Sequence, residues 1–293
     1  MPPSALPPGR RLRTPTKGRL LTLSSDLGPA YSAQVRAVLY QSVPPERVIE
    51  LTHDLPPHGV AEAAFLLLYM AGGFPPGTVH LAVVDPGVGG RRAPVAVRCA
   101  DGSWLVGPDN GLLSPLAEKL GRPSAFRIDR VPLDLPAPVS ATFDGRDLFA
   151  PVAARIAASR RTPKLGPALP LLRYVLPVAR RHRTGAAGSV LHIDRFGNVV
   201  TNVPTTWAPS PGATVRFRPD MRRLRPALRS ASYEGLPIGV VGVVGSSFGF
   251  LELALREARA AELLRMHVGS SVDFLWGPTR RSAVVKEPLY LAR

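Results

Sequence analysis

The chain has 293 residues, 45% of them hydrophobic and 20% charged, which is typical of a folded protein and excludes a mainly disordered chain. Lys and Arg total 37 against 21 acids, which gives a formal charge of +16. No apolar run reaches the roughly 18–20 residues of a membrane span, and one cysteine, Cys99, excludes an intramolecular disulfide. We expect a cytoplasmic protein with no secretory signal.

The basic excess is almost entirely arginine and is concentrated in residues 173–183 and 216–229. Such charge attracts anions, including nucleic acid, in a salt-dependent way. Neither stretch has interleaved aromatic residues for base stacking or the pattern of a zinc finger. We therefore interpret these arginines as solvated surface residues, with a nucleic-acid partner as the lesser alternative.

In chain order, residues 1–18 are predicted to be a flexible tail. Strands and helices then alternate, which is typical of a parallel α/β sheet. The expected strands are Leu20–Ser25, Val48–Leu51, Thr78–Val84 and Trp104–Val106. The expected helices are Tyr31–Tyr40, Val60–Met70, a segment from Leu112 onward and Leu148–Ala158.

After Arg183 the pattern changes to short apolar or alternating runs separated by turns, with one helical segment at Glu257–Leu264. This pattern predicts a second, mostly antiparallel β domain, a small barrel or sandwich. Thr184–Gly188 is interpreted as a small-residue linker. The expected organisation is an N-terminal α/β domain at 19–183, a β domain at 189–277 and a C-terminal tail at 278–293.

The segment Asp85–Arg92, DPGVGGRR, follows a buried strand, where open α/β sheets bind ligands. Its glycines allow a sharp bend, so Arg92 can return to pair with Asp85. An ordinary turn with a surface ion pair explains the segment equally well. No P-loop or G-x-G-x-x-G pattern is present, which disfavours a nucleotide phosphate site.

Other polar residues follow strands in the same way: Asp26 ends the first strand, and Asp109 and Asn110 follow another. Each alone is explained by turn chemistry, but together they favour a site for a polar ligand such as a ribose. In Thr142–Phe149, Asp147 is expected to cap a helix and Arg146 to pair locally. The six histidines lack metal-ligand spacing and no G-x-S-x-G elbow occurs, so we expect a metal-free site of carboxylates and arginine.

Seven motifs occur along the chain in this order: SDLG, LTHDLPP, FPPGTVHLAVVDPGVGGRR, PDNGLL, TFDGRDLFAPVAA, HIDRFGNVVTN and SSFGFLELA. Their order is the one found in the S-adenosylmethionine (SAM) hydroxide adenosyltransferases, which are related to the fluorinases and chlorinases. The chain resembles this family over about Leu20 to Phe274.

The resemblance implies an N-terminal α/β domain, a C-terminal antiparallel β-barrel and a homotrimer with sites at subunit interfaces. It also implies hydrolysis of SAM by attack of water or hydroxide on ribose C5′, which releases adenosine and L-methionine. A sulfonium is already a good leaving group, so such a site needs mainly to align and activate the nucleophile. No cofactor or metal is expected.

Position by position, the resemblance implies that Asp85 and Arg92 hold and polarise the water. Asp85 also distinguishes this chain from the halogenases, which have tyrosine there, because a carboxylate repels a halide. The other matched positions contact the substrate; they are Asp26 at the ribose hydroxyls, Phe196 and Asn198 at the nucleoside, Asp194 near the methionine end, and Ser247, Glu252 and Leu255 in the closing C-terminal segment.

The chain departs from the family pattern at Asp144, where the family has a histidine beside the water. A carboxylate is a weaker base than an imidazole at neutral pH, although it can still accept a hydrogen bond from the water. The first loop is also shorter than usual, and Ser246 and Arg256 each replace an asparagine. These changes leave two alternatives to hydrolysis: a homologue that binds SAM or adenosine without turnover, and a SAM-dependent halogenase.

Overall fold

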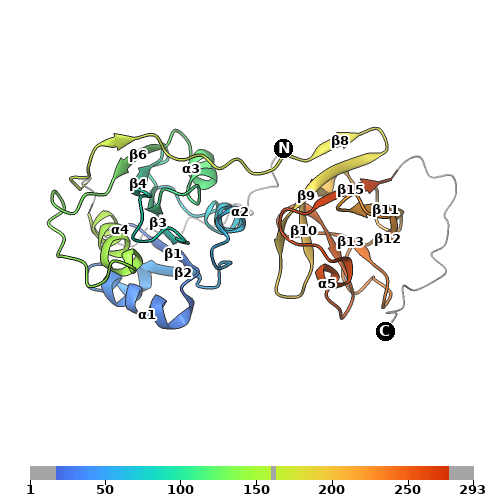
Figure 1. Ribbon diagram of the computed structural model, residues 1–293, viewed down its shortest axis with the longest axis horizontal. Helices are drawn as coiled ribbons and strands as arrows, with labels where there is room; N and C mark the ends of the chain where they lie inside the picture. The colour runs from blue at the N-terminus through green and yellow to red at the C-terminus, as the bar shows by residue number, and fades with distance from the viewer. Residues whose placement is uncertain (1–17, 160–162, 277–293) are drawn as a thin grey trace. The chain divides into compact units, whose positions relative to one another are not determined.

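The computed structural model describes residues 18–159 and 163–276. The chain divides into two compact units, and the boundary along the sequence lies between Leu176 and Pro177 (Figure 1). The predicted tails at 1–18 and 278–293 lie outside the described residues, apart from Gly18. The domain limits 19–183 and 189–277 stay a prediction. Among the described residues, none of the helices combines the length and hydropathy needed to span a membrane.

The first unit is built on a seven-stranded sheet with the order β2-β1-β3-β5-β4-β6-β7. Its strands are β1 (Leu21–Ser25), β2 (Val48–Thr52), β3 (Val79–Val83), β4 (Pro94–Arg98), β5 (Trp104–Pro108), β6 (Ser124–Arg127) and β7 (Ala168–Leu169). Neighbours among β2, β1, β3 and β5 run parallel, whereas β4, β6 and β7 pair antiparallel. The expected mainly parallel sheet is therefore confirmed.

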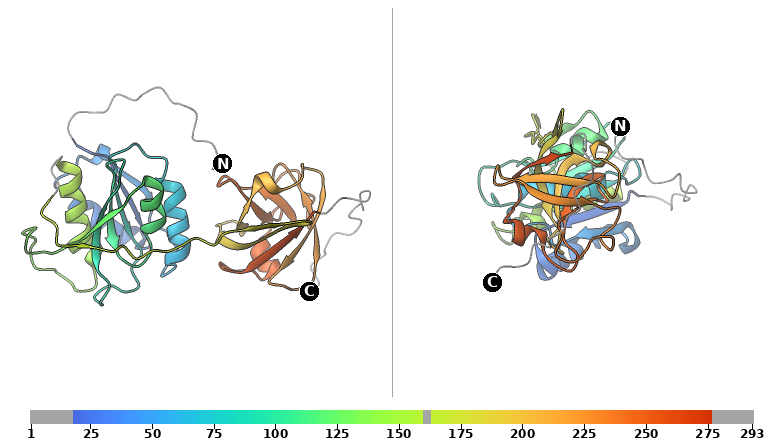
Figure 2. Two further views of the ribbon diagram at one scale, coloured as in Figure 1. Left: turned by 90° about the horizontal axis from the view of Figure 1, so that it is seen from above. Right: turned by 90° about the vertical axis from the view of Figure 1, so that its right-hand side faces the viewer.

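Helices cover both faces of this sheet (Figure 2). They are α1 (Gly28–Leu39), α2 (Val60–Ala71), α3 (Ser114–Leu120) and α4 (Ala150–Ala158). One apolar core includes residues of α1 and α4, and a second includes residues of α2 and α3. Because helices bury both faces, β1, β3 and β5 are buried along their whole length, and polar residues such as Thr22, Ser24 and His80 are buried with the apolar ones.

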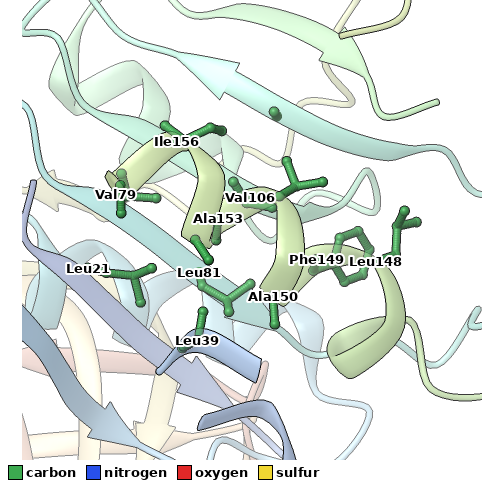
Figure 3. Close-up of a cluster of buried hydrophobic side chains, with 14 of the residues drawn as sticks. Leu21, Leu39, Val79, Leu81, Val106, Leu148, Phe149, Ala150, Ala153 and Ile156 are labelled. Carbon is green, nitrogen blue, oxygen red and sulfur yellow. The ribbon is translucent and has the colours of Figure 1, made fainter. Parts of the chain in front are cut away.

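Helix α4 shows how the first core is packed. Figure 3 shows Ala150, Ala153 and Ile156 of this helix facing Leu81 and Val106 from the sheet. Small residues on the helix allow it to lie close to the strands. Pro151 stands in the first turn of α4, directly after the π-helical turn Gly145–Phe149.

The second unit is a barrel of seven strands, closed by pairing of β9 with β10. The barrel strands are β9 (Gly185–Ile193), β10 (Val199–Pro204), β11 (Thr214–Pro219), β12 (Arg225–Arg229), β13 (Gly242–Gly245), β14 (Phe250–Ala254) and β15 (Ser271–Leu275). An eighth strand, β8 (Arg180–His182), lies outside the closed barrel and pairs only with β9. All pairs are antiparallel except β12 with β13. The predicted barrel is confirmed, with this one parallel pair as an addition, and helix α5 is Ala260–Leu264.

The interpretation of Thr184–Gly188 as a linker is wrong, because Gly185–Gly188 begin strand β9. The small residues serve close packing. A Cβ atom on Gly185 would lie only 1.8 Å from the carbonyl oxygen of Phe274 on the paired strand β15. The composition that suggests a flexible connection therefore belongs to a crowded part of the sheet.

Candidate active site

Two carboxylates lie together because they follow neighbouring parallel strands. Strands β1 and β3 are in register up to the pair Ser25 and Val83, and the backbone N–H of Asp26 donates to Val83 O at 3.2 Å. Asp26 follows the first of these strands and Asp85 comes shortly after the second. This places both at the carboxyl edge of the sheet, as the sequence predicts.

Arg92 joins Asp85 to a third carboxylate, that of Asp144. Its Nε lies 2.9 Å and its Nη2 2.5 Å from Asp85 Oδ2, and the same Nη2 lies 2.6 Å from Asp144 Oδ2. The guanidinium also lies over the Phe149 ring, 5.3 Å from its centroid. The three charged side chains are 6–17% exposed, so this is a shielded cluster and not the surface ion pair of the alternative interpretation.

The loop between Asp85 and Arg92 turns sharply at its glycines. Gly89 has φ +74°, and a Cβ there would lie 3.0 Å from Ala141 O in the segment that leads to Asp144. Glycine is therefore required both by the backbone angle and by the close approach of the second segment.

The two carboxylates of the cluster stabilise the charged form of Arg92. Burial lowers the pKa of the Arg92 guanidinium, but hydrogen bonds and charges from Asp85 and Asp144 outweigh burial and raise that pKa above its ordinary value. With one guanidinium between two carboxylates, the ionised cluster carries a net negative charge. It therefore attracts cations and repels anions.

Asp26 is half-buried beside this cluster. Burial raises the pKa of its carboxyl, the negative charge of Asp85 raises it further, and the backbone N–H of His58 partly opposes both. That N–H lies 3.4 Å from Asp26 Oδ2, and His58 has the left-handed φ of 61° that is uncommon outside glycine. Strained backbone of this kind is concentrated at functional sites.

Asp144 precedes a π-helical turn, Gly145–Phe149, that leads into α4. Nearby lies a cavity of about 380 Å³, lined by Leu27, Tyr31, Gln34, Ser140, Thr142, Phe143 and Arg146. The predicted local pairing of Arg146 with Asp147 is present at 2.6 Å. The predicted helix cap is wrong, because Asp147 Oδ2 instead accepts from the backbone N–H of Ser140, which fixes the approach to Asp144.

Asp109 and Asn110 are occupied by backbone partners. Asp109 Oδ1 accepts from Leu172 N at 2.8 Å, and Asn110 Nδ2 donates to Val84 O, also at 2.8 Å. The second bond holds the residue directly before Asp85. These side chains therefore support the strand ends by bonds to distant backbone groups. Turn chemistry accounts for one further bond, from Leu112 N to Asn110 Oδ1 at 3.2 Å.

In the barrel unit, Asp194, Phe196, Asn198 and Leu255 line one cavity of about 780 Å³. Asp194 shapes its wall: Oδ1 accepts from the backbone N–H groups of Phe196 and Asn198, and Oδ2 accepts from Asn198 Nδ2, all at 2.9 Å. Four of the residues that the sequence suggests are thus brought together in this unit.

Glu252 contacts the cavity wall through Tyr233, a residue that sequence reasoning missed. The Tyr233 hydroxyl donates to the carboxylate of Glu252, which is 2% exposed, and Tyr233 itself lines the cavity. Burial raises the pKa of Glu252, the Tyr233 hydrogen bond opposes this, and Asp194 adds to it. The contact depends on how the 230–236 loop packs on β14, so no local signal in the sequence reveals it.

Ser247 is the candidate that the structure does not bring to this cavity. It is exposed in the turn before β14, whereas Leu255 follows the other end of that strand. The two residues are therefore separated by the length of the strand. Among the described residues, no three His, Cys, Asp or Glu side chains are grouped as a metal site.

Comparison with known proteins agrees with this architecture. The family model of the SAM hydroxide adenosyltransferase N-terminal domain matches residues 21–166, and that of the C-terminal domain matches residues 188–273. The chain belongs to this family. Both units of the chain therefore have counterparts in the proteins of this family.

Similar family proteins include one from Thermus thermophilus and one from Salinispora arenicola, both named (R)-S-adenosyl-L-methionine hydrolase. They are 40% and 37% identical, and each match covers 86% of this chain and 97% or 96% of the relative. A fluorinase from Actinoplanes sp. is more distant at 25% identity over 86% of this chain and 96% of its own.

Solved structures show the same similarity. A conserved protein from Thermotoga maritima is 30% identical, with a TM-score of 0.77 over 87% of this chain and all of its own. A conserved hypothetical protein from Thermus thermophilus is 34% identical, with a TM-score of 0.69 over 88% of this chain and all of its own.

Proposed function

We propose that this protein hydrolyses SAM to adenosine and L-methionine. The observation that carries the proposal is the shielded Asp85–Arg92–Asp144 cluster at the carboxyl edge of the sheet, in a chain whose relatives at 37–40% identity are named SAM hydrolases. The proposal assigns the cluster to the attacking water and Asp26 to the ribose hydroxyls. Asp194, Phe196, Asn198, Ser247, Glu252 and Leu255 are proposed to contact the rest of the substrate.

In the proposed reaction, a water oxygen attacks C5′ in line with the C5′–S bond. The new C–O bond forms as the C–S bond breaks, and its electron pair stays on sulfur, which becomes the neutral thioether of methionine. The water proton passes to a carboxylate of Asp85 or Asp144 and then to solvent. The departing thioether requires no acid, so the cluster acts by orienting the water and accepting its proton.

The charge of the cluster favours hydrolysis over halogenation. Arg92 is already paired with two carboxylates, so its guanidinium offers no uncompensated positive charge to a halide. A neutral water can donate hydrogen bonds to the same carboxylates, which an incoming halide cannot do. Asp144, in the place of the family histidine, is proposed to share this role and not to abolish turnover.

The test is incubation with SAM in ¹⁸O-water, with and without chloride, followed by mass spectrometry. The expected products are adenosine carrying ¹⁸O at C5′ and free methionine. A chlorinated nucleoside would overturn the charge argument. Binding of adenosine without any product would replace the proposal with the non-catalytic alternative.

We also propose a cytoplasmic homotrimer whose sites combine the α/β unit of one subunit with the barrel of the next, as the family resemblance implies. The support is indirect: the candidate residues are divided between two units, and each unit holds only part of the set. Sedimentation or light scattering is expected to give three times the mass of one chain, 31.3 kDa. A monomer would remove this arrangement.

A further inference from the structure

A chain of hydrogen bonds that the proposed reaction does not use connects helix α1 to the end of strand β1. Arg36 Nη1 donates to Glu50 Oε1 at 3.0 Å, and Glu50 Oε2 lies 2.7 Å from His53 Nε2. His53 Nδ1 lies 3.0 Å from Ser25 Oγ. Ser25 is the residue directly before Asp26.

The chemistry of these groups sets the direction of each bond. Burial raises the pKa of Glu50, but His53 and Arg36 outweigh burial and lower that pKa, so the carboxylate is ionised and can only accept. His53 Nε2 therefore carries a proton and donates to Glu50, and Nδ1 is the ring nitrogen that faces the Ser25 hydroxyl. The Ser25 oxygen in turn accepts from the backbone N–H of Leu27 at 3.5 Å.

The arrangement resembles a nucleophilic Ser–His–acid triad but cannot act as one. Ser25 is completely buried in β1, so no substrate atom can reach its hydroxyl. The imidazole is also reversed relative to such triads, because Nδ1 and not Nε2 is bonded to the serine. With its serine buried, a chain of this kind can fix positions but cannot attack a ligand.

What the chain fixes is the backbone on both sides of Asp26. Gly28 N donates to His53 O, and Leu55 N donates to Ser25 O, each at 3.0 Å. The segments 25–28 and 53–55 are thus held together by backbone bonds and by the His53 side chain. Asp26 lies between these two bonded positions, Ser25 and Gly28, so the bonds fix the backbone from which its carboxylate projects.

We propose that His53 is a positioning residue that holds Asp26 in place for the ribose hydroxyls of the substrate. This inference rests on the proposed function, because it assumes that Asp26 accepts those hydroxyls. It assigns His53 no contact with the reacting atoms.

Two substitutions separate the two bonds of His53. In His53→Asn, the amide oxygen replaces Nδ1 and keeps the bond to Ser25. In His53→Gln, the amide nitrogen replaces Nε2, which keeps the bond to Glu50 and loses the bond to Ser25. If position is transmitted through Ser25, His53→Gln is expected to raise KM for SAM about three- to tenfold with little change in kcat, while His53→Asn stays near the wild type.

The second readout is binding of adenosine and of 2′,3′-dideoxyadenosine by calorimetry. Because Asp26 has no hydroxyl to bind in the dideoxy compound, His53→Gln is expected to weaken adenosine binding and leave dideoxyadenosine binding unchanged. The matched control is His182→Gln in the barrel, where His182 Nε2 lies 2.9 Å from Asp273. Melting curves of all three variants show whether folding is intact.

The outcomes distinguish the two proposals. Equal loss for both nucleosides, or a His53→Gln variant that prefers adenosine as strongly as the wild type, overturns the positioning role. Wild-type protein that prefers adenosine but forms no product from SAM overturns the reaction, and the binding comparison still decides the role of His53. Wild-type protein that binds neither nucleoside removes both.

Discussion

At the scale of single residues, the candidate site is a group of three carboxylates around one guanidinium. Asp85 and Asp144 share one guanidinium, and Asp26 lies beside them with its pKa raised by burial and by Asp85. Perturbed groups of this kind are concentrated at functional sites, where the requirements of a ligand outweigh those of stability.

Replacement of the proposed water-binding carboxylate tests the reaction most directly. Asp85→Asn keeps the shape but removes the charge and the proton acceptor, so adenosine formation is expected to fall about 10²–10⁴-fold. The matched control is Asp129→Asn, since Asp129 pairs with Arg127 at 2.7 Å on the surface of the same unit. Chromatography measures the adenosine that each variant forms from SAM. Unchanged turnover in Asp85→Asn would contradict the proposed mechanism.

The raised pKa of Asp26 predicts a trade between stability and function. Because the folded protein holds this proton more tightly than the unfolded chain, stability falls as pH rises from the ordinary value of 3.8 through the raised pKa. Asp26→Asn removes this cost, so it is expected to raise the melting temperature at pH 7 but not below pH 3.8. The same variant is expected to raise KM for SAM. Melting curves across pH check the first effect, and a less stable variant at pH 7 contradicts it.

The hydrogen bond from Tyr233 to the buried carboxylate of Glu252 makes a separate prediction for the barrel. Tyr233→Phe leaves that carboxylate without its hydroxyl donor, which is expected to reduce the free energy of unfolding by about 1–3 kcal/mol. Tyr40→Phe is the matched control, because Tyr40 is exposed to a similar extent, 42% against 46% for Tyr233. Equal denaturant midpoints for both variants would show that the pair contributes nothing.

At the scale of elements, the loop from Asp85 to Arg92 returns the Arg92 side chain to the end of strand β3, where the candidate site lies. Gly89→Ala is expected to cost about 1–2 kcal/mol of backbone strain and also to displace the Ala141 segment that leads to Asp144. Gly102→Ala is the matched control, since Gly102 has φ +84° but no atom within 3.8 Å of a Cβ there, the nearest being 3.9 Å away. Urea unfolding is expected to show similar losses, whereas SAM turnover falls only in Gly89→Ala.

At the scale of the whole molecule, the proposed trimer predicts complementation between two inactive variants. Asp85→Asn damages the α/β unit and Asn198→Ala the barrel, so co-expression leaves some sites with both intact units. Random assembly is expected to restore about a quarter of wild-type turnover. If each site were formed within one subunit, every site in the mixed oligomers would stay inactive. The assay of SAM turnover would then show no recovery of activity.

Much of the molecule follows from local sequence. The runs LLTLSS and TVHLAVV predicted β1 and β3 as buried strands that end at a turn. Both strands are buried along their whole length, with Thr22, Ser24 and His80 buried beside the apolar residues. The loop from Asp85 to Arg92 predicted its own ion pair, since the glycines let a short segment fold back. Prediction failed at Gly185, where small residues serve a close strand contact and not a linker.

The tertiary structure decided which distant groups meet. Asp144 reaches Arg92 across 52 residues, a proximity that the family resemblance implied but that no local pattern predicts. The contacts of His53 with Ser25, across 28 residues, and of Tyr233 with Glu252, across 19, were revealed by the structure alone. Local patterns record whether a residue prefers a strand, a turn or burial, because these preferences act over a few positions. Contact between remote side chains depends on strand order and loop packing, which the whole chain determines together.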